Sequence, residues 1–339
     1  MAPKEGVISK SGLKNIPKFE GKSMVCIRKG KTPYEMVCEI FSALDVDRVI
    51  EKGDTVLVKP NFSMLWKLPW KGSLTSPEFL EATVKAVRER TKAGEIIIGE
   101  GGGGTQTWKS FFEFGVVEMA QKYNARPVDL NWDEAWKVRV PDPYVLEELW
   151  VTRTAHALAD VVISVPVLKG WGSGVTLTLK NMMGTAPGRY YGFAKGGIPH
   201  GKKDDPGDIL YGQSKTLAGS IVDICYVNRM NIALIDALTV MYPKTLPKPG
   251  ATLFKEEWQV DELHMAIGGY DPVAVDTIGT AIMGLNPSKI LHIGMAAAKG
   301  LGTNRFEEIL IEGEPLEKVK HPCNPWHPGL EEIRESKVG

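Results

Sequence analysis

The sequence lacks several features that would place it in a familiar class of protein. It has only four cysteines among 339 residues, and no two of them have the C-x-x-C spacing of a zinc or iron–sulfur ligand set. With so few cysteines at this length we expect no disulfide framework, a reducing cytoplasmic location and no intrinsic iron–sulfur cluster. No apolar run reaches the roughly 20 residues that a membrane span needs. Lysines also interrupt the N-terminal stretch in which a signal peptide would have its apolar core.

The chain also lacks an excess of either charge. Lysine and arginine number 41, and so do aspartate and glutamate. No overall field therefore favours nucleic acid or an anionic membrane, and we expect neither as a partner. The six histidines have no H-E-x-x-H spacing and no G-x-S-x-G occurs, so a zincin and an α/β-hydrolase are not indicated.

Short apolar runs dominate what is present, and five of them are followed by a charged residue. Such runs, with helical stretches between them, are typical of parallel strands that are buried on both faces. We therefore predict an α/β protein with a doubly wound, mostly parallel sheet, helices on both faces and long loops over the carboxyl edge. The runs and the charged residues are Val56–Val58 with Lys59, Ile96–Gly99 with Glu100, Val161–Leu168 with Lys169, Ile232–Ile235 with Asp236, and Met265–Ile267 with Asp271.

The domain organisation that we predict is simple. Residues 1–22 form a basic N-terminal arm, residues 23–312 a single large α/β domain, and residues 313–339 a proline-rich polar tail. The irregular stretch 131–151 is the candidate point of subdivision. Two segments rich in glycine or proline, 189–211 and 240–251, are expected as loops, and long loops inside a compact domain are usually functional or disordered.

Parallel strands end at one edge of the sheet, which is where open α/β sheets place their ligands. The simplest explanation for any one charged residue there is that the chain meets water as it leaves the core. Lysines that crowd each other or lose water have a lowered pKa and can move protons. We therefore take Lys59, Lys169 and Lys180, with His200 from the 189–211 segment, as candidate catalytic residues; solvated surface lysines are the alternative.

Other residue types near these lysines are suited to holding a small anion. Four glycines follow the second apolar run, and we interpret them as an anion-holding or merely tight turn rather than as a dinucleotide fingerprint or a Walker loop. The full set of candidate substrate-binding residues is Asn61, Glu100, Gly101, Gly102, Gly103, Thr105, Trp171, Thr176, Asn181 and Asp236.

Several carboxylates are candidates for a divalent cation, which is the cofactor that the sequence alone suggests. Glu100, Asp236, Asp271 and Asp276 are oxygen ligands of the kind that magnesium prefers. An ion network with the lysines is an equal alternative. Asp271-Pro272 also has the pattern of a helix N-cap, which is a structural role.

These segments, taken in order, resemble the domain-of-unknown-function 362 family. The similarity runs from Val25 to Gly302 and is carried by six motifs. Many relatives have ferredoxin-type cysteine clusters, which this chain lacks, and Gly170-Trp171 stands where relatives commonly have a threonine-histidine pair. The family is also distantly similar to the N-terminal region of nickel-pincer lactate racemases. The motifs are Val58–Phe62, Val165–Lys169, Val175–Gly184, Asp236-Ala237, Asp271–Asp276 and Gly300–Gly302.

Three functions remain open from the sequence. The first is an enzyme, isomerase- or lyase-like, that acts on a small carboxylate or phosphate metabolite by lysine-assisted proton transfer. The second is an oxidoreductase that works with an external iron–sulfur partner or a flavin. The third is a metabolite-binding protein without catalysis. A small anionic ligand is expected in each case, and a homo-oligomer is an open alternative.

Overall fold

The computed structural model describes residues 8–62, 70–104, 106–171, 174–192, 195–201, 207–210, 213–244 and 258–323. The strands are β1 (Ser23–Lys29), β2 (Thr55–Pro60), β3 (Glu95–Glu100), β4 (Arg126–Asp129), β5 (Ala135–Arg139), β6 (Glu148–Thr152), β7 (Val161–Val165), β8 (Val167–Trp171), β9 (Gly174–Thr176), β10 (Ile209–Leu210), β11 (Gln213–Ser214), β12 (Ile232–Pro243), β13 (Trp258–Gly269) and β14 (Ile309–Gly313). The helices are α1 (Pro33–Leu44), α2 (Trp70–Ser73), α3 (Pro77–Arg90), α4 (Thr107–Glu113), α5 (Val116–Lys122), α6 (Thr178–Asn181), α7 (Gly188–Tyr191), α8 (Lys215–Val227), α9 (Pro272–Ile282), α10 (Leu291–Ala298) and α11 (Leu316–Val319).

One large sheet organises the molecule, with the strand order β14-β1-β13-β12-β7-β2-β3-β4. Neighbouring strands from β12 through β7, β2 and β3 to β4 are parallel, and β1 is parallel to β14. Strand β13 runs against both of its neighbours, β1 and β12. The predicted α/β class with a mostly parallel sheet is therefore confirmed, while the prediction that Met265–Ile267 forms a parallel strand is wrong.

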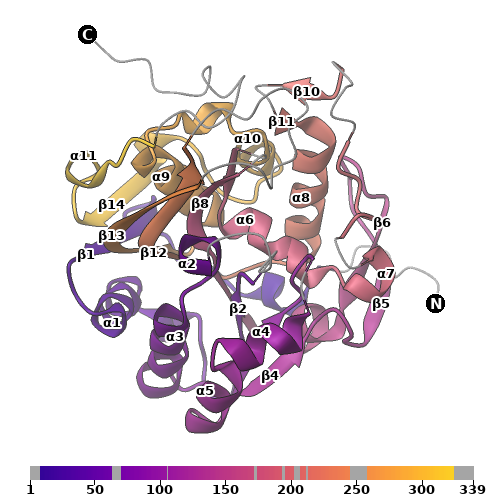
Figure 1. Cartoon of the computed structure of the whole chain (residues 1–339), viewed down its shortest axis with the longest axis horizontal. Helices are drawn as coiled ribbons and strands as arrows, with labels where there is room; N and C mark the ends of the chain where they lie inside the picture. Colours follow the sequence, from indigo (N-terminus) through magenta and orange to yellow (C-terminus); the bar gives the residue numbers. More distant parts are fainter. Residues whose placement is uncertain are drawn as a thin grey trace.

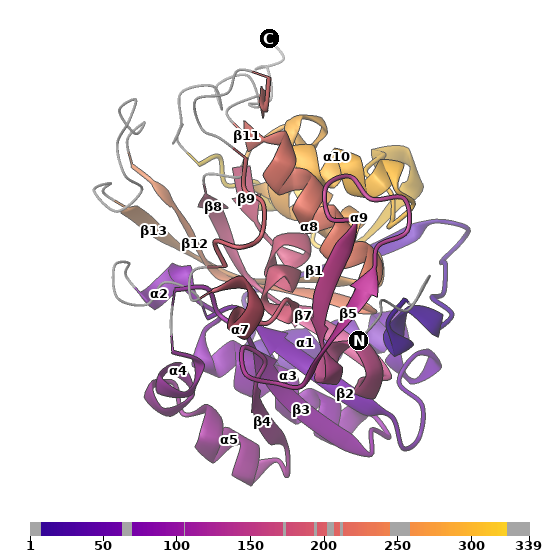
Figure 2. The same ribbon diagram turned by 90° about the vertical axis from the view of Figure 1, so that its right-hand side faces the viewer.

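Helices cover both faces of the sheet (Figures 1 and 2). Helices α1, α3, α4 and α5 lie on one face, where their apolar side chains pack with inward-facing residues such as Val56, Val58 and Ile163. Helices α8, α9 and α10 lie on the other face and pack against Leu57 and Val162, among others. Alternate residues of the same strand thus enter opposite cores, which explains why the parallel strands are apolar throughout.

The direction in which the strands succeed one another reverses between β2 and β7. From β2 the chain continues to β3 and β4 on one side, then returns to place β7 beside β2 and continues to β12 and β13 on the other. The loops that follow β2 and β7 consequently diverge at the carboxyl edge. Open α/β sheets have their ligand crevice at such a reversal.

Proline divides the longest predicted strand into two. Val161–Leu168 reads as one strand, but Pro166 has no N–H for the ladder, and its carbonyl accepts a hydrogen bond from Asp236 N (2.8 Å). Strand β7 ends before Pro166, and β8 begins after it and pairs with the second half of β12. Strand β12 extends to Pro243, so the start of the predicted loop 240–251 is in fact strand.

Two further segments contain regular structure. The 131–151 stretch, which the sequence left as either irregular or antiparallel, contributes β5 and most of β6, which pair with each other as a separate antiparallel hairpin. The 189–211 segment includes the end of α7 and the short strand β10. Within the described part of the chain, no helix is both long enough and apolar enough to span a membrane.

Candidate functional site

A buried ion pair joins the ends of β2 and β3 at the carboxyl edge. Lys59 is fully buried and Glu100 is 1% exposed, and the Lys59 ammonium donates to Glu100 Oε2. Glu100 Oε1 accepts from the backbone N–H of Phe62 (3.2 Å), so both carboxylate oxygens have partners. Burial lowers the pKa of Lys59, and the charge of Glu100 opposes that shift. A charge at this depth is costly without its partner, so the two residues act as one unit.

Two amides extend this pair into a network that reaches Lys169. Asn181 Oδ1 accepts hydrogen bonds from Lys59 Nζ (3.1 Å) and from Asn61 Nδ2 (3.2 Å). Asn61 Oδ1 in turn accepts from Lys169 Nζ (2.8 Å), which also donates to the carbonyl of Ser73 (2.5 Å). Residues from the ends of β2, β3 and β8 and from α6 are thus joined, as the shared carboxyl edge predicts.

Burial destabilises the protonated forms of the lysine amino groups in this region. Burial, followed by the charge of Lys180, lowers the pKa of Lys169 from 10.5 to about 7, and Glu100 opposes the shift only in part. Burial alone lowers the pKa of Lys180 to about 8. Since each free amine is available near neutral pH, both can accept as well as donate a proton.

A third such lysine was not predicted. Lys195, 4% exposed, donates to Asn131 Oδ1 (2.6 Å) and to the carbonyl of Ala186. Burial, with the charge of Lys59, lowers its pKa to about 7, against the opposing charges of Glu100 and Asp129. Lys195 belongs to a glycine-rich segment without periodicity, and no sequence signal distinguishes it from a solvated lysine.

Glycines let the backbone approach the ion pair closely. A Cβ at Gly184 would lie 2.6 Å from Lys59 Nζ, and one at Gly101 would lie 2.3 Å from the carbonyl oxygen of Gly184. A side chain at Gly101 would collide with backbone, and one at Gly184 would require the buried Lys59 amine to move. The chain after α6 packs directly over Lys59 and against the glycine turn.

The glycine turn, which the sequence left as either an anion-holding or a merely tight turn, is closely packed in the structure. The spacing from Gly99 to Gly104 does satisfy G-x-G-x-x-G, which our interpretation of the sequence overlooked. However, Gly99 still belongs to β3, Gly184 covers Gly101, and the carbonyl of Gly102 accepts from Asn131 Nδ2 (3.1 Å). Gly101 and Gly102 are buried, and Gly103 is partly exposed.

The candidate carboxylates do not converge. Because β13 is antiparallel, Asp271 lies at the amino edge, where it caps α9 and accepts from Ser23 Oγ (2.6 Å). Asp236 lies at the carboxyl edge and accepts from the backbone N–H groups of Ser76 (2.8 Å) and Leu238 (3.1 Å). Burial raises its pKa to about 6. Among the described residues, no three His, Cys, Asp or Glu side chains form a group that could hold a metal ion.

Asp276 has a structural role. Its carboxylate accepts from the backbone N–H groups of Thr178 (2.9 Å) and Leu179 (3.0 Å) and from the Thr178 hydroxyl (2.5 Å). These bonds hold the start of α6, the helix that carries Lys180 and Asn181. Burial, opposed by these hydrogen bonds, raises the pKa of Asp276 to about 7.

Three further groups surround the lysines on the side of α8 and α10. Thr176 is the cross-strand partner of Lys169 in the β8–β9 hairpin, and its buried hydroxyl has no hydrogen-bond partner within the described ranges. Burial lowers the pKa of His200, and the charge of Lys180 lowers this pKa further. His292, which was not predicted, is 1% exposed, and burial with the charge of Lys180 lowers its pKa to about 3. Thr105 and the Trp171 side chain lie outside the described residues.

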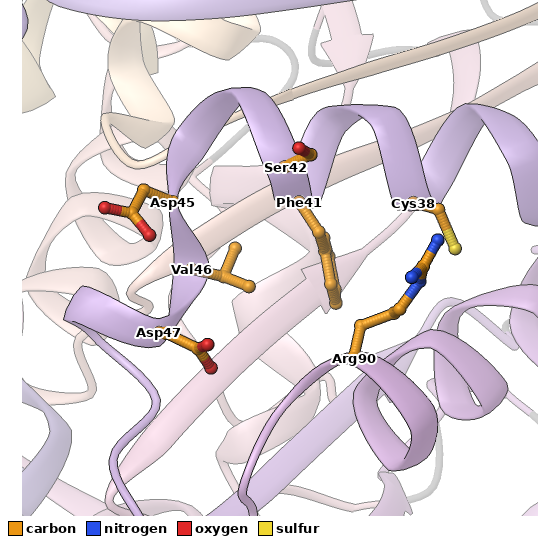
Figure 3. Close-up of a pocket in the computed structure, with 7 residues that line it drawn as sticks. All are labelled: Cys38, Phe41, Ser42, Asp45, Val46, Asp47 and Arg90. Atoms are coloured by element: carbon orange, nitrogen blue, oxygen red, sulfur yellow. The ribbon is translucent and has the colours of Figure 1, made fainter.

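A surface pocket elsewhere contains none of the candidate residues. It lies between the C-terminal ends of α1 and α3 (Figure 3). Both helices run from the carboxyl edge of the sheet back to its amino edge, so the pocket lies at the amino edge, away from the candidate residues. In Figure 3 the Arg90 side chain points toward Cys38. The lining residues are Cys38, Phe41, Ser42, Asp45, Val46, Asp47 and Arg90.

Comparisons with known proteins identify the family. No curated protein matches the sequence. The fold is similar to the lactate racemase apoprotein from Thermoanaerobacterium thermosaccharolyticum, at 11% identity and a TM-score of 0.47, over 79% of this chain and 59% of that one. This chain thus matches less than two thirds of that protein's length. A family model described as Domain of unknown function (DUF362) matches residues 56–281, which include Lys59, Glu100, Lys169 and Lys180. The chain therefore belongs to the DUF362 family, as its ordered motifs predicted.

Proposed function

We propose that the protein is an enzyme that binds a small carboxylate or phosphate metabolite among its buried lysines and transfers a proton to or from it, as an isomerase or lyase does. The observation that carries the proposal is Lys169. This lysine is buried, held by an amide and a carbonyl, and has a pKa of about 7. A group that titrates near neutral pH is suited to general acid–base catalysis.

The balance of charge favours an anionic ligand. Four lysines meet at the carboxyl edge, and the fully buried acid among them, Glu100, is engaged by Lys59. Buried cations without counter-ions are costly. A ligand carboxylate or phosphate would stabilise the protonated forms of Lys169, Lys180 and Lys195. This stabilisation would contribute to the binding free energy of the ligand.

The residues around Lys169 have different roles in the proposed reaction. The ion pair of Lys59 and Glu100 provides a fixed anchor, and Asn181 and Asn61 connect that anchor to Lys169 through hydrogen bonds. The amide oxygen of Asn61 holds the Lys169 amine in one orientation. A proton that Lys169 takes from a carbon next to a carboxylate can be returned from the same amine, which is the sequence of steps in an isomerisation.

Proton uptake on binding tests the anion site. Titration calorimetry of phosphate and of small carboxylic acids at about pH 8, in buffers of different ionisation enthalpy, should show on the order of one proton taken up per ligand. Uptake is expected because an anion raises the lysine pKa values. The Lys169→Met variant should take up fewer protons than wild type, by up to about one per ligand, and Lys52→Met, at an exposed turn, should keep the wild-type uptake. Binding without proton uptake, or equal uptake in both variants, would contradict the proposal.

Hydrogen exchange separates an enzyme from a binding protein. The acids that bind are incubated with the protein in deuterium oxide, and loss of the proton next to the carboxylate is followed by nuclear magnetic resonance. Wild type and Lys52→Met should catalyse the exchange, and Lys169→Met should not. If an acid binds with proton uptake and no carbon-bound proton exchanges, the non-catalytic function is the correct one.

A further inference from the structure

Lys180 differs from the other three lysines of the site in having no acceptor for its amino group. Lys59 pairs with Glu100, Lys169 donates to an amide and a carbonyl, and Lys195 does the same. Among the described residues, no hydrogen bond or ion pair reaches Lys180 Nζ. Lys180 is also the one of the four that keeps exposed surface along its side chain. Lys180 thus combines a partly exposed side chain with an amine that has no acceptor in the described part of the chain.

The groups around this amine disfavour its protonated form. The charge of Lys180 acts on Lys169, on His200 and on His292, which places these three about its amino group. All of them are bases or cations, and none offers a carboxylate. Among the described residues an ammonium here has neither an acceptor nor a counter-ion, so the neutral amine is the favoured form as soon as the pH allows it.

The helix that carries this amine is anchored, and two buried polar atoms, one of them opposite Lys169, have no partner among the described residues. Helix α6, on which Lys180 stands, is held at its first turn by the three hydrogen bonds to the Asp276 carboxylate. Thr176, opposite Lys169 in the hairpin, is 4% exposed, and His292 is 1% exposed. Thr176 Oγ1 and His292 Nε2 are buried without a partner among the described residues. Unpaired buried polar atoms are costly, and a bound oxygen would satisfy them.

We propose that Lys180 is a nucleophile that condenses with the carbonyl group of an oxo acid to form an imine. The inference rests on the proposed function, because it needs Lys169 to hold the acid group. A neutral, desolvated lysine amine beside a second cation is suited to this reaction. The amine nitrogen attacks the carbonyl carbon and forms the C–N bond. The carbonyl oxygen gains two protons and leaves as water, and nothing is oxidised or reduced.

The unpaired atoms have a role in this step. The carbinolamine that forms first carries a hydroxyl group, which must be held and protonated before it leaves as water. We assign the unpaired Thr176 hydroxyl and His292 imidazole to hydrogen-bond that oxygen, and the two protons that it gains are those that the Lys180 amine loses. The substrate class that follows is a small acid with a ketone or aldehyde group, rather than a phosphate ester or a simple carboxylate.

Trapping with cyanoborohydride tests the proposal. Formaldehyde, which fits any site, and pyruvate are each added with cyanoborohydride at about pH 8, and the labelled peptides are read by mass spectrometry. With pyruvate, the Lys180 peptide should gain the mass of the acid less one oxygen atom. At this pH a pKa of about 8 leaves about 100-fold more free amine than a pKa of 10.5. Because nucleophilicity falls with pKa, we expect labelling on the order of tenfold faster than at Lys52.

Matched variants test whether Lys180 is the lysine that carries the adduct. Lys180→Arg keeps the charge and should abolish the pyruvate adduct, whereas Lys52→Arg should leave it unchanged. Equal labelling of Lys180 and Lys52 by formaldehyde, or a pyruvate adduct on Lys169 instead, would overturn the assignment. If wild type takes up protons on binding acids but forms no adduct with pyruvate, the imine proposal fails and the proton-transfer function stands. If no acid binds at all, the proposed function itself fails.

Discussion

The most direct test of the site is to replace Lys169 with methionine and follow stability against pH. The pKa of Lys169 falls from 10.5 in an unfolded chain to about 7 in the folded protein. Between these values the unfolded chain binds a proton that the folded protein does not. Stability therefore rises with pH across this window, and the cost of burying Lys169 is fully present below it. Methionine, of similar length and without charge, removes this contribution.

The size of the effect follows from the shift. A lysine whose pKa is lowered from 10.5 to about 7 costs the folded state roughly 4 kcal/mol at neutral pH and roughly 2 kcal/mol near pH 9. The free energy of unfolding of wild type, measured against that of Lys169→Met, should rise by about 2 kcal/mol from about pH 7 to about pH 9. The variant also leaves Asn61 Oδ1 without this donor, at about 1–3 kcal/mol, but that loss does not depend on pH.

Urea denaturation at a series of pH values gives both curves. Subtracting one from the other cancels the titration of every group that the variant retains, so only Lys169 and its direct neighbours contribute. Lys52→Met, from an exposed turn, is the control and should differ from wild type by an amount that does not change with pH. A difference between wild type and Lys169→Met that stays constant from about pH 7 to about pH 9 would refute the desolvation argument on which the site rests.

Three other changes test the surroundings of Lys169. Glu100→Gln should lower the free energy of unfolding by about 3–5 kcal/mol at neutral pH, because it leaves the Lys59 charge buried alone; a loss below about 1 kcal/mol in urea denaturation would show that the pair is not coupled. Gly184→Ala places a methyl group 2.6 Å from Lys59 Nζ and should abolish anion binding in calorimetry, whereas Gly196→Ala, with open space around it, should not; equal affinities would contradict the close packing. In Asp276 the folded pKa is raised from 3.8 to about 7, so wild-type stability should fall as pH rises through this range, and Asp276→Asn should flatten that part of the curve.

The sequence predicted which candidate residues would gather at one edge of the sheet, because strand direction carries that information. Lys59, Glu100 and Lys169 each follow an apolar run, and parallel strands bring their ends to one edge. The same argument failed for Asp271. A strand that is buried on both faces is apolar throughout whether it runs parallel or antiparallel, and β13 runs antiparallel. Composition therefore identified the strand but not its direction.

The residues that sequence reasoning missed are those that loops bring in. Lys195 and Asn131 follow no periodic pattern, and their burial depends on how α7 and the segment after it fold back over β3 and β4. His292 stands near the start of α10, where a histidine is usually solvated or packed. The sequence likewise contains the pattern G-x-G-x-x-G. However, the backbone of Gly184 lies against Gly101 and limits what the turn can bind.

Buried lysines of this kind are difficult to explain as structural elements. A stable core would place apolar side chains at these positions, since replacing a buried charge with an apolar residue of similar size is often neutral or stabilising. Lys59 has a full counter-ion, but in the part of the chain that the structure describes Lys169 and Lys195 have only neutral acceptors and Lys180 has none. The proposed function accounts for this cost, because a small anionic partner bound among these lysines would compensate their charge. The cost of holding these amines close to neutrality is then the reason that they can exchange protons, or form a bond, with that partner.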